Sequence, residues 1–209
     1  VVQGHSPDTG WPELARACVA VRAGARWVAC NVDATLPSER GELPGNGAMV
    51  AALRTATGAE PEVAGKPRAP LLRTAAESAG ATDPLVVGDR PDTDIAGAVA
   101  AGYRSLAVLT GVATPAALLG LAPHERPDHL ADDLAVLAGE VPAEALGVDD
   151  GDPTPDDGVP WRVADDGAVL TVTAVPGAYP DPTGVDLLRR LCARAWRSGT
   201  TAVRGGDAT

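Results

Sequence analysis

The sequence predicts an α/β fold in which a doubly wound, Rossmann-like parallel sheet carries a small α+β extension at its C-terminal end. Short apolar runs alternate with stretches whose apolar residues recur at helical spacing, as expected for strands that single helices connect. The runs at 85–87 and 105–109 are almost entirely apolar, which is typical of parallel strands buried on both faces. A ligand site is therefore expected outside the carboxyl ends of these strands.

Helix signals recur along the first half of the chain. Pro12 suits a first helical position and apolar residues continue at helical spacing, so a helix is predicted over 12–22. The same reasoning predicts helices over 48–57, 69–79 and 93–101, each followed by a glycine. Between these helices, strands are predicted at 26–30, around Val63, at 85–87 and at 105–109.

The composition changes after about residue 139. Residues 140–160 are rich in Pro, Gly and Asp and are predicted to form an acidic linker. Beyond it, strands at 161–163 and 169–175 are expected to pair as a hairpin across Asp166-Gly167.

A helix is predicted after this hairpin. Thr183 and Asp186 resemble a capping box, and one face of the helix collects apolar residues: Leu188, Leu191, Cys192, Ala195 and Trp196. The unit is too small for a deep core of its own, so we expect it to pack on the main domain or on a partner. Residues 200–209 are predicted to be a disordered tail.

Charge and composition limit the function classes. The 209 residues carry a formal net charge of −11, and no stretch alternates basic with aromatic residues, which argues against a nucleic-acid partner. No apolar run reaches the ~20 residues that a membrane helix needs, so no membrane partner is expected. Cys18, Cys30 and Cys192 are far apart and lack CxxC spacing, which indicates reduced, structural thiols in a cytoplasmic protein.

The acidic segment after the run 85–87 is the strongest candidate for chemistry, because the run ends at Gly88 and opens onto Asp89, Asp92 and Asp94. Mg²⁺ typically takes one or two protein carboxylates, and Asp89, one residue beyond a buried strand, fits that need. Close carboxylates repel each other by roughly 3 kcal/mol per pair at an effective dielectric near 20, so a cation or a helix N-terminus must offset them. For Asp92, helix capping is favoured over metal binding.

A second candidate, Lys66, lies in Gly65-Lys66-Pro67 after a short extended run. A lysine on a proline-stiffened turn suits neutralisation of a phosphoryl group. Gly-Lys-Pro by itself is a common surface turn, but the acidic segment that follows favours a functional interpretation. Asn31 and Asp33 follow a predicted strand and form either an Asx turn or a ligand contact, and these two alternatives stay open.

Four segments, in this order and spacing, resemble the haloacid dehalogenase (HAD) superfamily, in particular its p-nitrophenylphosphatase/NagD-like branch with a large cap domain. They are Asn31-Val32-Asp33 with Pro37, Pro44 to Gly47, Gly65-Lys66-Pro67 and Val87 to Ile95. The match runs from about residue 1 to 137. The region after Pro160 resembles the C-terminal extension of actinobacterial glycerol-phosphate phosphatases.

This resemblance implies a domain order: the C-terminal part of a cap over 1–43, an incomplete HAD-like core over 44–139, the linker over 140–160, the extension over 161–199 and the tail over 200–209. It also implies that strand 85–87 normally pairs with a strand that this sequence does not contain. A homo-oligomer through the cap is expected.

The resemblance further implies a Mg²⁺-dependent phosphatase, a phosphoric monoester hydrolase acting on a small phosphorylated metabolite, with glycerol phosphate as the candidate. Lys66 would neutralise the transferred phosphoryl group and hold the nucleophile. Asp89 would bind Mg²⁺ directly, and Asp94 would hold the waters of the metal. Asn31 and Asp33 would bind substrate where the cap returns to the core.

The nucleophilic and proton-donating aspartates of the family lie in an Asp-x-Asp-Gly loop that this sequence lacks. We therefore expect a C-terminal fragment that begins inside the cap and is inactive by itself. The alternative is a non-catalytic binding module, or half of a split protein that needs a partner chain. The segment 164–170 imitates such a loop but carries Ala164 at the nucleophile position and is better explained as a hairpin turn.

The histidines receive no role. His5, His124 and His129 are predicted to lie in loops or polar surroundings without a nucleophile partner.

Overall fold

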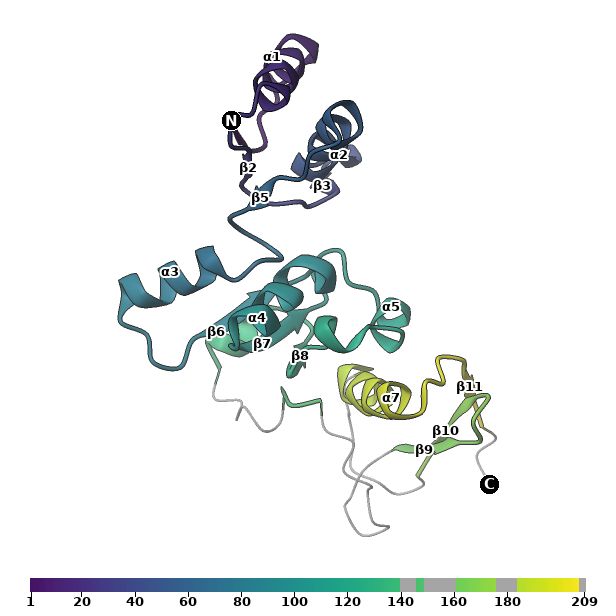
Figure 1. Ribbon diagram of the computed structural model, residues 1–209. Helices are drawn as coiled ribbons and strands as arrows, with labels where there is room; N and C mark the ends of the chain where they lie inside the picture. Colours follow the sequence, from purple (N-terminus) through teal and green to yellow (C-terminus); the bar gives the residue numbers. More distant parts are fainter. Residues whose placement is uncertain (140–145, 149–160, 176–183, 207–209) are drawn as a thin grey trace. The chain divides into compact units, whose positions relative to one another are not determined.

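A computed structural model describes residues 1–139, 146–148, 161–175 and 184–206 (Figure 1). The chain divides into two compact units, Val1–Pro84 with Asp92–Tyr103, and Leu85–Pro91 with Arg104–Thr209. Each unit is described by itself.

The first unit contains two small sheets and four helices within the described residues. Its elements are β1 (Val2–Gln3), α1 (Trp11–Arg22), β2 (Val28–Ala29), β3 (Thr35–Ser38), β4 (Gly41–Pro44), α2 (Asn46–Thr57), β5 (Glu62–Val63), α3 (Pro70–Ala79) and α4 (Ala96–Ala101). Strands β1, β2 and β5 pair in that order and are parallel, while β3 and β4 form an antiparallel hairpin. This hairpin was not predicted, because each strand contains a proline, and a proline within a run argues against a strand.

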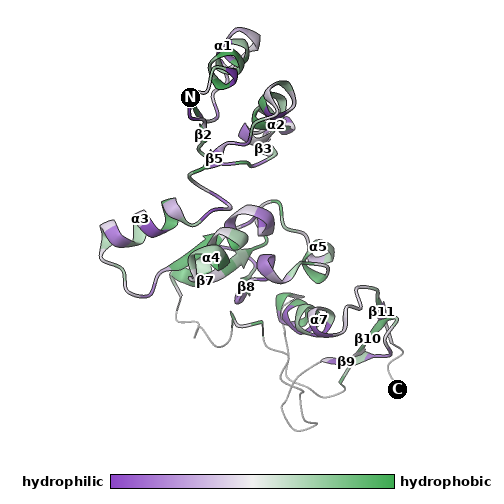
Figure 2. Ribbon diagram, in the orientation of Figure 1, coloured by the Kyte–Doolittle hydropathy of each residue, from purple (hydrophilic) through white to green (hydrophobic). Residues whose placement is uncertain are grey.

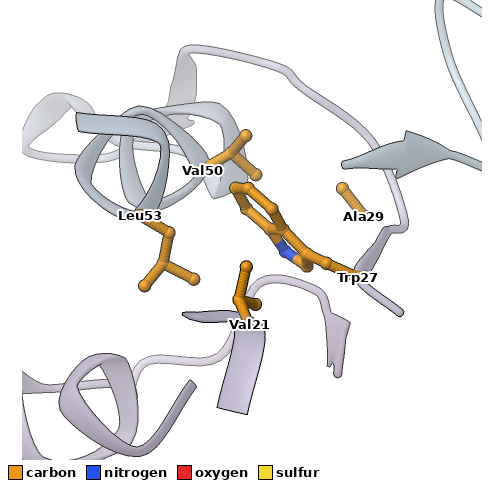
Figure 3. Packing of buried hydrophobic residues seen from close by; sticks show 5 residues of the cluster. All are labelled: Val21, Trp27, Ala29, Val50 and Leu53. Atoms are coloured by element: carbon orange, nitrogen blue, oxygen red, sulfur yellow. The ribbon is translucent and has the colours of Figure 1, made fainter. Parts of the chain in front are cut away.

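The core of the first unit forms around the indole of Trp27. Figure 3 shows this ring among Val21 of α1, Ala29 of β2, and Val50 and Leu53 of α2, all of them buried. The predicted helices over 12–22, 48–57 and 69–79 are confirmed to within two residues at each end. The predicted helix over 93–101 differs, because a π-helical turn η1 (Pro91–Ile95) precedes α4.

The second unit is built on a parallel sheet whose strand order is β6-β7-β8. Its elements are β6 (Leu85–Gly88), β7 (Arg104–Val108), α5 (Pro115–Leu119), the 3-10 turns η2 (Pro123–Glu125) and η3 (Leu134–Leu137), β8 (His129–Ala131), β9 (Trp161–Asp165), β10 (Leu170–Ala174), α7 (Gly184–Ser198) and β11 (Val203–Gly205). The central strand β7 is hydrophobic over most of its length (Figure 2) and is buried from its second residue onward. Two parallel sheets thus confirm the predicted α/β class.

Two features of the β6-β7-β8 sheet bear on the expectations from sequence. Within the described residues β6 pairs with β7 alone, and the expected pairing of β6 with a strand outside this sequence stays a prediction. Of the two predicted settings for His129, a loop or polar surroundings, the loop was wrong, since His129 begins β8, opposite Leu106. Its Nδ1 lies 3.0 Å from the Ser105 carbonyl oxygen. A three-residue strand carries too little pattern to predict, and its pairing with β7 defines it.

The C-terminal extension is an antiparallel hairpin, a helix and a third strand. The hairpin β9-β10 turns at Asp166-Gly167, as predicted, and Asp166 accepts hydrogen bonds from the Ala168 and Val169 amides. The prediction of a disordered tail was wrong for Val203–Gly205, which pair with β10 in parallel as β11. The tail has little apolar pattern, and the open edge of β10 determines its conformation.

Helix α7 buries the predicted face, including Leu188, Leu191, Cys192 and Ala195. Most of the predicted linker, at 140–145 and 149–160, and the predicted capping residue Thr183 lie outside the described residues. No helix of the described chain combines the length and apolar character that a membrane crossing requires.

Candidate functional site

Lys66 lies at the centre of a charged group in the first unit. It follows β5, and its Nζ is 2.8 Å from Oδ1 of Asp94 and 3.6 Å from Oδ2 of Asp33. The Asp94 and Asp33 side chains are only 10% and 18% exposed, while that of Lys66 is 36% exposed. One cation is therefore shared by two largely buried carboxylates and remains accessible from solvent.

The electrostatics of this group favour the charged lysine. Burial lowers the pKa of Lys66, but the hydrogen bond and charge of Asp94, together with Asp33, outweigh burial and raise the pKa above its ordinary value. Lys66 is therefore a permanent cation at neutral pH, as neutralisation of a phosphate oxygen requires.

Asp94 reaches Lys66 from the π-helical turn η1. Thr93 and Asp94 are buried in this turn, whereas Asp92 is exposed. The acidic segment thus splits into residues that face the protein interior and one that faces solvent. The capping prediction for Asp92 stays a prediction.

The loop that carries Asn31 and Asp33 is held by the start of α2. The Gly47 amide donates to the Asp33 carbonyl oxygen at 2.8 Å, and Asn46 Nδ2 donates to the Asn31 carbonyl oxygen at 2.7 Å. A Cβ on Gly47 would fall 2.2 Å from the Val32 carbonyl oxygen, so a side chain there would push the loop away. Asn46 and its glycine neighbour therefore position Asp33 for its contact with Lys66.

The geometry around Asn31 and Asp33 shows an Asx-type contact, while a ligand contact of these residues stays a prediction. The Asp33 amide lies 3.4 Å from Asn31 Oδ1, a long Asx-type contact, while the Asp33 carboxylate faces Lys66. Three buried polar atoms, Asp33 Oδ1, Asn46 Oδ1 and Thr93 Oγ1, have no hydrogen-bond partner in the described part of the chain. Such atoms fit a site that takes a polar ligand.

Asp89 belongs to the second unit, where the loop that follows β7 binds it. Its Oδ2 accepts a hydrogen bond from the Val112 amide at 2.8 Å, and its carbonyl oxygen accepts one from Ala113 at 2.9 Å. A Cβ on Gly111 would lie 1.9 Å from Oδ2, so only glycine allows this approach. We call residues 109–113 the Asp89-binding loop.

The donor set around Asp89 fits Mg²⁺. Among the described residues, no three His, Cys, Asp or Glu side chains gather in a way that could enclose a metal ion. Mg²⁺ does not need such a cage, because it keeps several waters and uses one or two carboxylates with substrate oxygens. A single carboxylate at a strand end, oriented by the backbone amide of Val112, meets that requirement.

The structure therefore brings Lys66, Asp33 and Asp94 together and places Asp89 in the other unit with its own loop. Sequence reasoning missed the positioning residues Asn46 and Gly111. An Asn between two glycines at a helix start is a usable signal for the first, whereas a lone glycine after a strand says little about the second.

Comparisons with known proteins show which family the chain resembles. Residues 63–137 match the family model for HAD-hydrolase-like proteins. The D-glycerol 3-phosphate phosphatase of Mycobacterium tuberculosis is 45% identical over 202 residues, which are 95% of this chain and 54% of that protein. The chain belongs to the haloacid dehalogenase-like hydrolases.

Solved structures support the same membership. A crystal structure of glycerol phosphate phosphatase from M. tuberculosis in complex with magnesium matches with a TM-score of 0.84 and 45% identity, over 99% of this chain and 59% of that one. The 4-nitrophenylphosphatase of Thermotoga maritima matches with a TM-score of 0.59 and 34% identity, over 66% of this chain and 53% of that one. The chain spans about half the length of the curated relatives that it matches.

Proposed function

We propose that these residues form part of a Mg²⁺-dependent phosphoric monoester hydrolase. The observation that carries the proposal is Lys66, which two buried carboxylates keep charged while its side chain stays open to solvent. Phosphoryl transfer depends mainly on positioning and charge neutralisation, and a fixed lysine supplies both.

In this proposal Lys66 contacts a phosphate oxygen, and Asp94 with Asp33 fixes its direction. The three charges sum to −1, so the group by itself repels a phosphate dianion. A further cation must offset this repulsion, which is consistent with a metal-dependent reaction. Asp33 and Asn31 contribute to substrate binding.

Asp89 would hold Mg²⁺ through its carboxylate. That Asp94 holds the waters of the metal stays a prediction from the family resemblance. When bound, Mg²⁺ supplies Lewis acidity and neutralises phosphate charge. The residues of this chain contribute orientation: the Val112 amide holds Oδ2, so the Asp89 carboxylate keeps one direction before any ligand arrives.

We propose a small phosphorylated metabolite as substrate, with glycerol phosphate as the first candidate. Support comes from the relative named D-glycerol 3-phosphate phosphatase, with which 95% of this chain aligns. A 5'-nucleotidase of Bacillus subtilis, 36% identical over 136 residues, provides the contrasting substrate class. Assays with glycerol 3-phosphate, a 5'-nucleotide and an aryl phosphate on a catalytically competent protein containing these residues distinguish the two, and preference for the nucleotide contradicts our choice.

We further propose that the 209 residues alone do not turn over phosphate esters, because the sequence contains no Asp-x-Asp-Gly nucleophile loop. The purified chain with Mg²⁺ and p-nitrophenyl phosphate should give only background rates. Robust Mg²⁺-dependent turnover by pure chain would show that another residue here acts as nucleophile.

Site variants test the assigned roles in a competent protein. Asp89→Asn and Lys66→Ala should each lower kcat by about 10²-fold or more, since both remove stabilisation of transition-state charge. Asp92→Ala is the matched control, because this neighbouring carboxylate is exposed, and it should cost little. Equal losses for Asp92→Ala and Asp89→Asn in steady-state kinetics would overturn the assignment within the acidic segment.

A further inference from the structure

The C-terminal extension is attached to the outer edge of the β6-β7-β8 sheet by one buried arginine. Arg189 of α7 is 7% exposed, and its Nε and Nη2 donate to the Leu130 carbonyl oxygen of β8 at 2.8 and 2.6 Å. Asp186, one turn earlier, accepts a hydrogen bond from its Nη1. Because β8 pairs with β7 on its other side, Arg189 satisfies an edge carbonyl that a further strand would otherwise bind.

The same end of β8 supports the Asp89-binding loop. The Leu109 amide, at the start of this loop, lies 3.2 and 3.1 Å from the carbonyl oxygens of Ala131 and Asp132, directly after Leu130. Three residues later the Val112 amide binds Asp89 Oδ2. The backbone that Arg189 fixes is therefore the backbone on which the loop rests.

The far end of the loop leads into a second contact with α7. Thr114 caps α5 through the Ala117 amide, and Leu118 of α5 accepts a hydrogen bond from Trp196 Nε1 at 2.8 Å. The Trp196 ring also carries the Arg126 guanidinium 5.5 Å from its centroid. Helix α7 thus binds both β8, on which the start of residues 109–113 rests, and α5, which follows them.

We infer that the C-terminal extension positions the Asp89-binding loop, with Arg189 and Trp196 as the positioning residues. Neither residue contacts Asp89; each acts through the backbone of β8 or α5. The inference rests on the proposed function, since the role of Asp89 as a metal ligand gives the support its purpose. The contacts themselves are independent of any metal.

Hydrogen–deuterium exchange on the metal-free 209-residue chain tests the mechanical part. Arg189→Met removes the guanidinium but keeps the aliphatic stem, so amides in residues 109–113 should exchange at least tenfold faster. Arg190→Met removes a charge from the adjacent, partly exposed position and should change these rates less than twofold. Arg189→Lys, which keeps the positive charge on a single donor nitrogen, should restore part of the protection. Unchanged exchange in a folded Arg189→Met chain would overturn the inference.

Trp196→Phe keeps the experiment decisive if Arg189→Met does not fold. It removes the Nε1 donor together with the five-membered ring of the indole and keeps one aromatic ring, and we expect amides of α5 and residues 112–113 to exchange about threefold faster. Wild-type exchange in both regions would contradict the support at this end of the loop.

Calorimetric titration with Mg²⁺ alone separates the inference from the proposed function. Arg189→Met should raise the Kd for Mg²⁺ at least fivefold, Arg189→Lys less, and Arg190→Met not at all, while Asp89→Asn abolishes binding. If Asp89→Asn abolishes binding but Arg189→Met binds like wild type, the support is wrong and the metal site stands. If Asp89→Asn binds like wild type, the metal assignment fails and the exchange data decide the support.

Discussion

Lys66 and Asp89 are held in different ways. Lys66 is oriented by side chains, through ion pairs with Asp94 and Asp33, and remains 36% exposed. Asp89 is oriented by backbone, through the amides of Val112 and Ala113 and a close approach of Gly111. The orientation of Lys66 therefore depends on pH and on the charge of its partners. The orientation of Asp89 depends instead on the space that Gly111 leaves, so it is sensitive to added side-chain volume.

The difference extends to the surroundings of the two residues. Cys30 is exposed. It lies close to Gly65, the residue before Lys66, because a Cβ added to Gly65 would fall 2.2 Å from the Cys30 carbonyl oxygen. In the second unit, Cys192 of α7 is almost completely buried, and α7 binds β8, on which the start of the Asp89-binding loop rests, and α5, which follows the loop.

The largest expected effect is on thiol reactivity, which measures this contrast directly. Burial raises the pKa of Cys192 to about 12, so its thiolate is scarce at pH 8. Maleimide should label Cys30 at least about 10³-fold faster than Cys192, because burial reduces both the thiolate fraction of Cys192 and the access of the reagent to it. Peptide mapping of labelled chain, with Cys192→Ser to assign the slow phase, gives the ratio. Comparable rates would mean that α7 does not stay packed.

Gly111→Ala should produce the next largest effect. The added Cβ would overlap Asp89 Oδ2, so the loop must move away, at a cost of about 2 kcal/mol or more in the free energy of unfolding. Gly120→Ala is the control, because its Cβ would meet its nearest neighbours at 3.9 and 4.0 Å, and it should stay within about 0.5 kcal/mol. Denaturant unfolding measures the loss in unfolding free energy for both variants. Equal losses would contradict the close contact between Gly111 and Asp89.

Lys66→Met should have a smaller effect, about 1–2 kcal/mol. It removes the Lys66 cation from beside two largely buried carboxylates, and partial exposure of the group moderates the cost. Arg26→Met, which breaks an exposed pair with Glu62, should cost less than about 0.5 kcal/mol and is the matched control.

The pH dependence of Lys66→Met sharpens the comparison further. Because the folded pKa of Lys66 is raised, its stabilising contribution is complete below the ordinary value of 10.5 and is lost as the pH rises through the folded pKa. The difference in unfolding free energy between wild type and Lys66→Met should therefore shrink only in alkaline solution. A difference that already shrinks near neutral pH would contradict the charged-lysine assignment.

Local patterns accounted for much of the fold. Helices α2, α3 and α4 end at Gly58, Gly80 and Gly102, all with positive φ, as the glycine signals predicted. The β9-β10 turn likewise follows from Asp166-Gly167. Where the pattern was short or weak, as at His129 and Val203–Gly205, the predictions failed, because pairing with a neighbouring strand defines those segments.

The sequence by itself determined the alternation of helices and strands, the family, and the choice of Lys66 and Asp89 as candidate residues. Only the tertiary structure decided that Asp94 is the nearer partner of Lys66, that Gly111 closes on Asp89, and that Arg189 binds the edge of β8. These contacts join residues 22 to 59 positions apart, as the pairs Asp89–Gly111 and Leu130–Arg189 show. Helical and strand periods record only which neighbours along the chain share a face, so no local pattern encodes such distant pairs.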